Sequence, residues 1–259
     1  MGMRALTESG AAPHRAPVAS DPARQAIRGL LFDKDGTLVD YAASWAPINR
    51  QAALLAAEGD IALADRLLRI AGGDPATNLA AADSVLAAGT AAEIAAVFAA
   101  GGSRLGSARL TRDLDALFQS AATSMVPVTD VAALFGRLKA RGLHLGIASS
   151  DSELAVRATA AHFGIIDFLD YIAGYDSGFG VKPEPGMVEG FCRAAGLAAG
   201  AVAVIGDNSH DMAMGRAAGA GLTIGVLTGT GSAASLAPLC DLCLAGIADL
   251  EQALFGGAG

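Results

Sequence analysis

Two aspartates stand two residues apart directly after a short apolar run. The run Ile27–Phe32 gives way at once to Asp33-Lys34-Asp35-Gly36-Thr37-Leu38, as a buried parallel strand does at the carboxyl edge of its sheet. In extended chain this spacing directs both carboxylates to one face and the side chain of Lys34 to the other. One carboxylate could attack an electrophile while the other transfers the leaving group's proton. Taken alone, the hexapeptide could also be a strand-to-turn junction.

A second acidic cluster follows another apolar run. The segment Ala201–Ile205 is followed by Gly206-Asp207-Asn208-Ser209-His210-Asp211, in which Asn208 or Ser209 could cap a helix. On the first turn of that helix Asp207 and Asp211 would face one direction, and with Asp33 they would form a hard-oxygen site suited to Mg²⁺. A capped helix start with solvated acids is the alternative.

Two further positions could serve a phosphate. Ser149 and Ser150 follow the apolar run Leu143–Ala148, where hydroxyls and backbone N–H groups at a helix terminus can hold an anion, although ordinary N-capping uses the same residues. Lys182, one of only three lysines, stands between glycine and prolines just before a helix. Its charge could neutralise the nucleophile or a phosphoryl group, or it could be a solvated loop lysine.

These polar groups require strands that end side by side. The predicted strands alternate with helices expected at Val131–Ala140, Glu153–His162 and Gly186–Ala195, and further strands are expected at Gly221–Leu227 and Leu242–Leu244. This alternation predicts a doubly wound parallel α/β sheet. Ligands of such sheets bind beyond the carboxyl ends of the strands.

The stretch between the first two predicted strands differs in composition. It is rich in alanine and reads as four or five helices, with starts expected at Asp74-Pro75 and at Thr90, which is followed three residues later by Glu93. We therefore expect a helical cap at residues 44–124, a core made of residues 25–43 and 125–259, and a flexible segment at residues 1–24.

Taken in chain order, the four sites resemble the motifs of the haloacid dehalogenase superfamily. Asp33 to Leu38 is similar to its first motif, DxDGT, Ser149 to its second, Lys182 to its third, and Gly206 to Asp211 to its fourth, GDxxxD. The resemblance covers about residues 26 to 250 and is strongest to the phosphoglycolate phosphatase-like branch. It implies an α/β core with an inserted helical cap.

The resemblance also implies a role for each residue. Asp33 would attack phosphorus and form an aspartyl-phosphate that water then hydrolyses, while Asp35 would protonate the leaving alkoxide and later deprotonate that water. Mg²⁺ would be held by Asp33, the backbone carbonyl of Asp35 and Asp207, with Asp211 as a ligand or support. The phosphate-binding residues would be Ser149, Ser150, Lys182 and Gly36.

The function expected from this resemblance is Mg²⁺-dependent hydrolysis of a small phosphorylated metabolite, with 2-phosphoglycolate as the leading candidate. A phosphomutase of the β-phosphoglucomutase type shares these motifs and is the second reading. A non-catalytic ligand-binding module is the third, and the intact set of Asp33, Asp35, Lys182 and Asp207 argues against it. The second acid, Asp35, disfavours 2-haloacid dehalogenases and phosphonoacetaldehyde hydrolases.

Composition excludes several partners. A net charge of −8 with few lysines argues against nucleic acid, and glycines and Pro238 interrupt the apolar run at residues 217–239, which argues against a membrane span. Three cysteines suggest no disulfide framework, so we expect a reducing, cytoplasmic location. The sequence indicates no particular oligomeric state.

Several residues near the expected cap and sites receive simpler interpretations. Tyr41 and Trp45 could pack the linker or line the substrate mouth, and packing is favoured. Cys240 and Cys243 are expected to be structural thiols, and residues 228–231 are too weak a pattern for a nucleotide loop. The cap cations that could recognise a substrate carboxylate or a second phosphate are arginines: Arg50, Arg66, Arg69, Arg104, Arg109 and Arg112.

Overall fold

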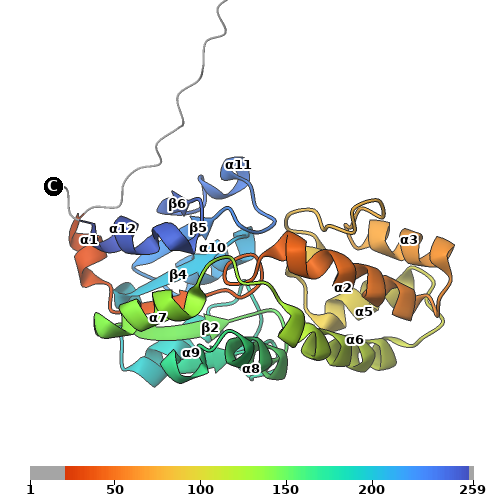
Figure 1. Ribbon diagram of the computed structural model, residues 1–259, viewed down its shortest axis with the longest axis horizontal. Coiled ribbons are helices and arrows are strands. Elements are labelled where there is room, and N and C mark those ends of the chain that lie inside the picture. The colour runs from red at the N-terminus through yellow and green to blue at the C-terminus, as the bar shows by residue number, and fades with distance from the viewer. Residues whose placement is uncertain (1–20, 257–259) are drawn as a thin grey trace, which may run out of the picture.

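A six-stranded parallel sheet forms the centre of the computed structural model, which describes residues 21–256 (Figure 1). The strand order β3-β2-β1-β4-β5-β6 places the first strand of the chain in the middle, so the sheet is doubly wound as expected. The strand at 171–173 was not predicted, although the strand at 242–244, which is equally short, was. The strands are β1 (Gly29–Phe32), β2 (His144–Ala148), β3 (Tyr171–Ala173), β4 (Val202–Gly206), β5 (Leu222–Val226) and β6 (Leu242–Leu244).

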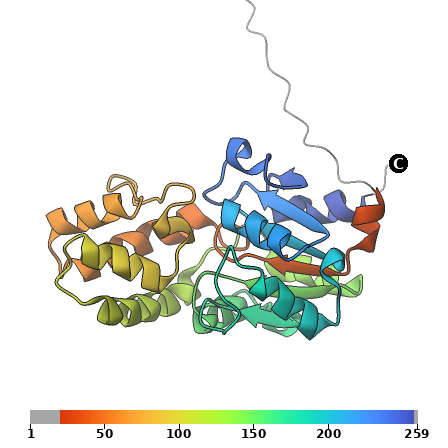
Figure 2. The ribbon, with the colours of Figure 1, turned by 180° about the vertical axis from the view of Figure 1, so that it is seen from behind.

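Helices cover both faces of this sheet (Figures 1 and 2). On one face, apolar side chains of α7 (Val131–Ala140), α8 (Glu153–His162) and α12 (Leu250–Phe255) pack with those of the strands. On the other face α9 (Gly186–Ala195) and α10 (Ser209–Ala217) do the same. The three helices predicted between the strands are confirmed at their predicted bounds. The short helices are α11 (Ala233–Leu236), η2 (Ile166–Phe168), η3 (Ala199–Ala201) and η4 (Ile247–Asp249).

The N-terminal segment is described only in part. Residues 1–20 of the predicted flexible segment lie outside the described residues, and residues 21–24 belong to α1 (Asp21–Ala26). The guanidinium of Arg24 donates to the carbonyl of Ala253 at 2.8 Å, so α1 is fixed beside α12.

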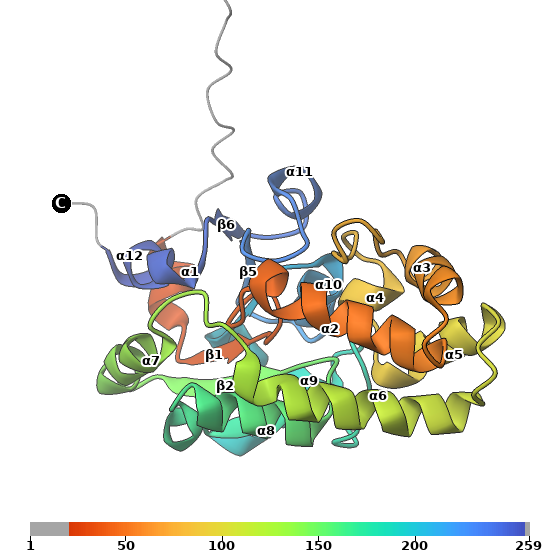
Figure 3. The same cartoon turned by 45° about the vertical axis from the view of Figure 1, so that its right-hand side comes forward.

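The insertion after β1 consists of helices and the loops that join them, and it lies beyond one end of the sheet (Figure 3). Its apolar residues form a hydrophobic cluster of their own. The expectation of four or five helices is confirmed, and Thr90 with Glu93 forms a capping box. The start expected at Asp74 is wrong, because the Asp74 carboxylate accepts from Ala76 N and Thr77 Oγ1 and closes a turn instead. The elements are α2 (Tyr41–Ala56), α3 (Ile61–Ile70), α4 (Val85–Ala88), α5 (Ala91–Ala100), α6 (Ser107–Ala121) and η1 (Ala122–Ser124).

Two linkers join the insertion to the sheet, and they pair with each other. Asp40 N donates to Val126 O at 2.8 Å, and Val128 N donates to Leu38 O at 3.0 Å. This pairing and the separate hydrophobic cluster support the division into cap and core, which we retain as a proposal. In the described part of the chain, no helix combines the length and the apolar character needed to cross a membrane.

Candidate active site

Three of the predicted site residues follow neighbouring strands in the middle of the sheet. Asp33 follows β1, Ser149 follows β2 and Asp207 follows β4, and the parallel register sets Phe32 of β1 opposite Ile147 and Ile205. Because parallel strands end at a common edge, these three side chains lie together.

A cluster of buried carboxylates occupies this edge. Carboxylate oxygens of Asp33, Asp207 and Asp211 all lie within 4.8 Å of one another. The ammonium of Lys182, from the loop between β3 and α9, lies 2.5 Å from Asp33 Oδ1 and 2.6 Å from Asp211 Oδ1. All four side chains are buried. The sequence separation between Asp33 and Lys182 is 149 residues, so only the tertiary fold brings the pair together.

The charges of this cluster are not balanced by protein groups. Burial raises the pKa of Asp33 to about 6 against the opposing effect of Lys182, and burial with the neighbouring Asp33 and Asp211 raises the pKa of Asp207 well above its usual value. Burial works against the charge of Lys182, but Asp211 and Asp33 outweigh it and hold its pKa above the usual range. One ammonium faces three carboxylates, and Asp33 Oδ2 is a buried atom without a hydrogen-bond partner. These oxygens fit a hard divalent cation.

The start of α10 is both a capped helix start and a part of the carboxylate cluster, two possibilities that the sequence left as alternatives. Asn208 is the N-cap, and its side chain accepts from His210 N at 2.9 Å. Asp211 Oδ2 accepts from Asn208 N at 3.3 Å, while its other oxygen holds Lys182. Helix capping therefore fixes the orientation of a carboxylate of the cluster.

A fourth strand end contributes to the site, and sequence reasoning assigned it no role. After β5, Thr230 donates to Asp207 Oδ2 from its backbone N at 2.7 Å and from its hydroxyl at 3.2 Å. Thr228 Oγ1 donates to Gly36 O at 2.6 Å. The sequence signal for this loop is the Thr-Gly-Thr-Gly run at residues 228–231, which is too weak a pattern to indicate a site.

Gly36 allows the first motif to lie against the second cluster. Its φ of +82° is in the left-handed region, and a Cβ built on it would lie 2.6 Å from Asp207 Oδ2. A side chain at this position would both strain the backbone and displace the Asp207 carboxylate.

Asp35 lies beside the cluster rather than in it. Its Oδ1 accepts from the indole Nε1 of Trp45 at 2.7 Å, and its Oδ2 lies 3.2 Å from the ammonium of Lys34. Burial raises the pKa of Asp35 to about 6, with Lys34 opposing the shift and Asp151 adding to it. A carboxyl group with this pKa can exchange a proton near neutral pH.

The predicted direction of Lys34 is wrong. Its side chain is buried, and its Nζ lies 2.7 Å from Asp151 Oδ2 as well as close to Asp35. The reason is that β1 ends at Phe32 and the chain turns, with Leu38 N and Val39 N both donating to Lys34 O. The alternation of an extended strand therefore does not reach Lys34.

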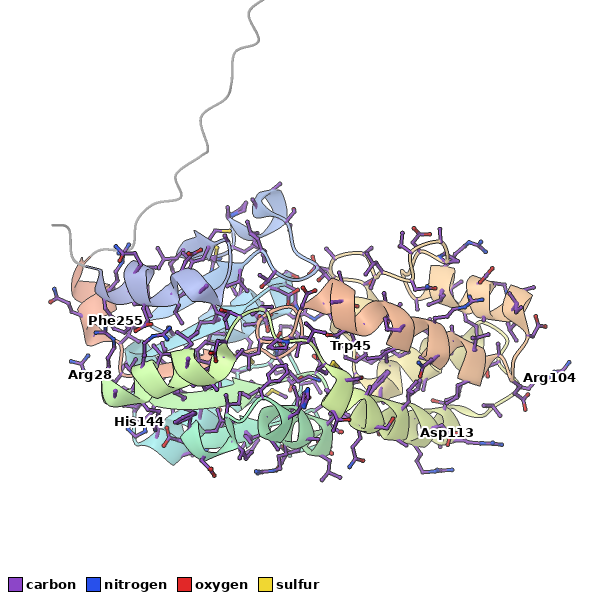
Figure 4. The ribbon with its side chains drawn as sticks, viewed as in Figure 1. Arg28, Trp45, Arg104, Asp113, His144 and Phe255 are labelled. Atoms are coloured by element: carbon purple, nitrogen blue, oxygen red, sulfur yellow. The ribbon has the colours of Figure 1, made fainter. Side chains whose placement is uncertain are left out.

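Trp45 does more than pack the linker, which was the favoured interpretation. It lies where the cap meets the sheet (Figure 4) and donates to Asp35. Its ring packs edge to face against that of Phe118, with the ring centroids 5.1 Å apart. With Ser150 and Asp151 it borders a cavity of about 40 Å³ between cap and core.

The two predicted serines lie at the end of β2. Ser149 is buried, and its Oγ accepts from Asp151 N at 3.1 Å. Ser150, the next residue, borders the cavity.

Known proteins are similar to this chain in sequence and in fold. Residues 27–219 match the family model of haloacid dehalogenase-like hydrolases. A phosphoglycolate phosphatase of Yersinia pseudotuberculosis is 30% identical over 238 residues, which are 89% of this chain and 94% of that protein. The crystal structure of a predicted phosphoglycolate phosphatase from Haemophilus somnus has a TM-score of 0.67 at 20% identity, over 88% of this chain and 97% of that one. CbbY from Rhodobacter sphaeroides, in complex with phosphate, has a TM-score of 0.65 at 19% identity, over 86% and 96%.

A doubly wound parallel sheet with paired aspartates after its central strand, together with the family match, defines the class of this protein. The chain belongs to the haloacid dehalogenase-like hydrolase family. Within that family it is similar to phosphoglycolate phosphatases over most of its length, and the expectation of a phosphatase enzyme is confirmed.

Proposed function

We propose that the protein is a Mg²⁺-dependent phosphomonoester hydrolase that acts on a small phosphorylated metabolite through an aspartyl-phosphate. The observation that carries this proposal is the placement of two buried aspartates with different partners. Asp33 contacts Lys182 in the carboxylate cluster, and Asp35 contacts Trp45 and Lys34 at the cavity. The environments suit a nucleophile and a proton donor respectively.

In the first step a carboxylate oxygen of Asp33 forms a bond to phosphorus while the bond from phosphorus to the leaving oxygen breaks. Lys182 offsets the negative charge that accumulates as the two anions approach, and the Ser149 hydroxyl and Ser150 bind phosphoryl oxygens, with Gly36 leaving room beside them. Asp33, the Asp35 carbonyl, Asp207 and Asp211 would hold Mg²⁺, which supplies further charge neutralisation when bound.

Asp35 acts on protons in both steps. It donates its proton to the leaving oxygen, and the alcohol departs with it. The carboxylate that remains then takes a proton from water, which attacks phosphorus, breaks the bond to Asp33 and releases inorganic phosphate. Trp45 and Lys34 hold the carboxyl group of Asp35 in place for both transfers.

The relatives make 2-phosphoglycolate the first named substrate to test. The assay is inorganic phosphate release from phosphorylated metabolites, with Mg²⁺ and with EDTA. Mg²⁺-dependent release supports the hydrolase. Turnover only in the presence of a bisphosphate activator, with isomerised sugar phosphate as product, would favour the mutase instead. The cytoplasm remains the proposed compartment, on the cysteine composition.

Replacing the nucleophile gives the sharpest single test. Asp33→Asn should lower kcat by more than about 10³-fold, because an amide cannot form the phosphoenzyme, and it should leave the circular dichroism spectrum unchanged. Substantial hydrolysis by the purified variant would show that Asp33 is not the nucleophile.

A further inference from the structure

The space beside Asp35 is where the leaving group of the substrate must lie. Under the proposed function, on which this inference rests, Asp35 protonates the leaving oxygen, so whatever is attached to that oxygen extends into the adjoining cavity. The cavity lies between core and cap and includes Asp35 and Asp151 on the core side. The character of its wall therefore determines which leaving groups are accepted.

The cap contributes an apolar wall. It is formed mainly by aromatic and aliphatic side chains of α2, α4, α5 and α6, namely Tyr41, Trp45, Leu86, Ile94 and Phe118. The residues with polar side chains that border the cavity are Tyr41, Trp45, Ser150, Asp35 and Asp151. Among the described residues that border this cavity, none is lysine or arginine.

Lys34, a cation close to the cavity, is already paired. Its ammonium lies 2.7 Å from Asp151, 3.2 Å from Asp35 and 5.6 Å from the centre of the Trp45 ring. Two carboxylates share this single ammonium. A carboxylate on the leaving group would therefore meet apolar surface and negative charge, and its desolvation would go uncompensated.

The cap arginines do not supply the missing cation. Arg50 is paired with Asp65 at 2.5 Å, Arg66 donates to the carbonyl of Gly101, and Arg109 is paired with Asp113. Figure 4 shows Arg104 at the end of the cap farthest from Trp45. The expectation that a cap arginine recognises a substrate carboxylate is therefore not met at this cavity, which none of the six arginines borders.

We propose that the cap selects phosphomonoesters whose leaving group is small, uncharged and apolar toward Trp45 and Phe118, in preference to a leaving group that carries a carboxylate. A volume of about 40 Å³ is far below the roughly 300–1,000 Å³ of pockets for larger ligands. It suits a leaving group of a few heavy atoms, and Ser150 borders it where a neutral polar substituent would lie.

The test compares substrates that differ only in charge. Phosphate release is measured with Mg²⁺ for 2-phosphoglycolate, for 2-phosphoglycolamide, which replaces the carboxylate by a carboxamide of the same size, and for propyl phosphate. We expect kcat/KM for each of the two neutral esters to exceed that for 2-phosphoglycolate by at least about tenfold. An equal or higher kcat/KM for 2-phosphoglycolate would overturn the inference and leave the phosphatase assignment standing.

A cation introduced into the wall should reverse the preference. Ala87 borders the cavity from α4, and Ala87→Arg should raise the ratio of kcat/KM for 2-phosphoglycolate over 2-phosphoglycolamide by about tenfold. Ala82→Arg adds the same charge at an exposed position nearby and should leave the ratio unchanged. Equal changes in both variants would contradict a role for the cavity wall.

The outcomes separate the two proposals. Hydrolysis of none of the three esters, nor of p-nitrophenyl phosphate, by well-folded protein would overturn the proposed function and the inference with it. Hydrolysis that favours the carboxylate ester would overturn only the inference.

Discussion

A single indole N–H links the cap to the proposed proton donor. Trp45 Nε1 donates to Asp35 Oδ1 at 2.7 Å, which fixes the carboxyl group while its other oxygen faces Lys34. In the first step Asp35 is needed as an acid only when the leaving oxygen is basic, since a weakly basic leaving group departs without a proton. The contribution of Trp45 should therefore depend on the leaving group.

Trp45→Phe keeps an aromatic ring but removes the donor. We expect kcat/KM, which reports formation of the phosphoenzyme, to fall about tenfold for propyl phosphate and by less than about twofold for acetyl phosphate, because a misplaced acid matters only for the alkoxide. Tyr171→Phe, which removes a hydroxyl of β3 that has no hydrogen-bond partner among the described residues and does not border the cavity, serves as the control. Equal losses on both substrates would assign Trp45 a purely structural role.

A glycine decides how closely the first motif approaches Asp207. Gly36→Ala should lower kcat by more than about 100-fold, because the added methyl group would lie 2.6 Å from Asp207 Oδ2, and it should also lose stability through left-handed strain of about 1–2 kcal/mol. Gly142→Ala should show the effect of left-handed strain alone, because Gly142 has φ +78° and no atom lies within 4 Å of an added Cβ. Activity measurements and urea unfolding of both variants separate the two effects. A fully active Gly36→Ala enzyme would disprove the close approach.

At the scale of elements, one carboxylate ties α7 to the sheet next to its edge strand. Asp170, just before β3, accepts from Lys139 Nζ of α7 at 2.8 Å and from Leu145 N of β2 at 2.9 Å. Burial acts to raise the pKa of Asp170, but these hydrogen bonds outweigh it and hold the pKa below its usual value. A lowered native pKa means that ionised Asp170 stabilises the fold.

The sign of the pH dependence follows from that shift. The stabilisation is complete above the unfolded-state pKa of about 3.9 and is lost as the pH falls through the lower native value. Asp170→Asn should therefore lower the free energy of unfolding by about 1 kcal/mol at pH 7, and the difference should shrink below about pH 4. Urea unfolding at several pH values measures it, with the exposed Asp167→Asn as control. A deficit that stays constant down to pH 2.5 would contradict the assigned charge effect.

At the scale of the whole molecule, the cap is fixed to the core by contacts far apart in the chain. The linkers pair at Val39 and Pro127, and Asp83 of the cap accepts from the backbone N and hydroxyl of Ser209 at the start of α10. Tyr175 of the core donates to Asp115 of α6 at 2.8 Å. These contacts hold the apolar cap wall above Asp35.

The unbalanced carboxylates predict how the whole fold responds to a metal ion. Mg²⁺ at about ten times its Kd should raise Tm by about 3–5 °C relative to EDTA, because binding to the folded state alone stabilises it. Asp207→Asn should lose this shift, and in EDTA it should be at least as stable as the unsubstituted protein, since one of three mutually repelling carboxylates is gone. Differential scanning calorimetry of both proteins checks this. An equal Mg²⁺ shift in the variant would place the ion elsewhere.

The sequence by itself determined the strand ends and their chemistry. Asp33, Ser149 and Asp207 could be assigned to a common edge because a buried strand that stops at a polar residue is a local pattern, and parallel strands end together. The capping box at Thr90 and the helices between the strands are equally local. The short strand β3 was not predicted.

The tertiary structure alone decided what surrounds those groups. The direction of Lys34 depends on Asp151, 117 residues away, and the role of the Thr228–Thr230 loop depends on Asp207, to which Thr230 bonds across the gap between two strands. The sequence led us to expect arginines of the cap near the substrate, but apolar side chains border the cavity instead, for the same reason. The packing of helices against the sheet determines which side chains border a cavity. Packing brings together residues that are far apart in the chain, and no periodic pattern in the sequence indicates such pairs.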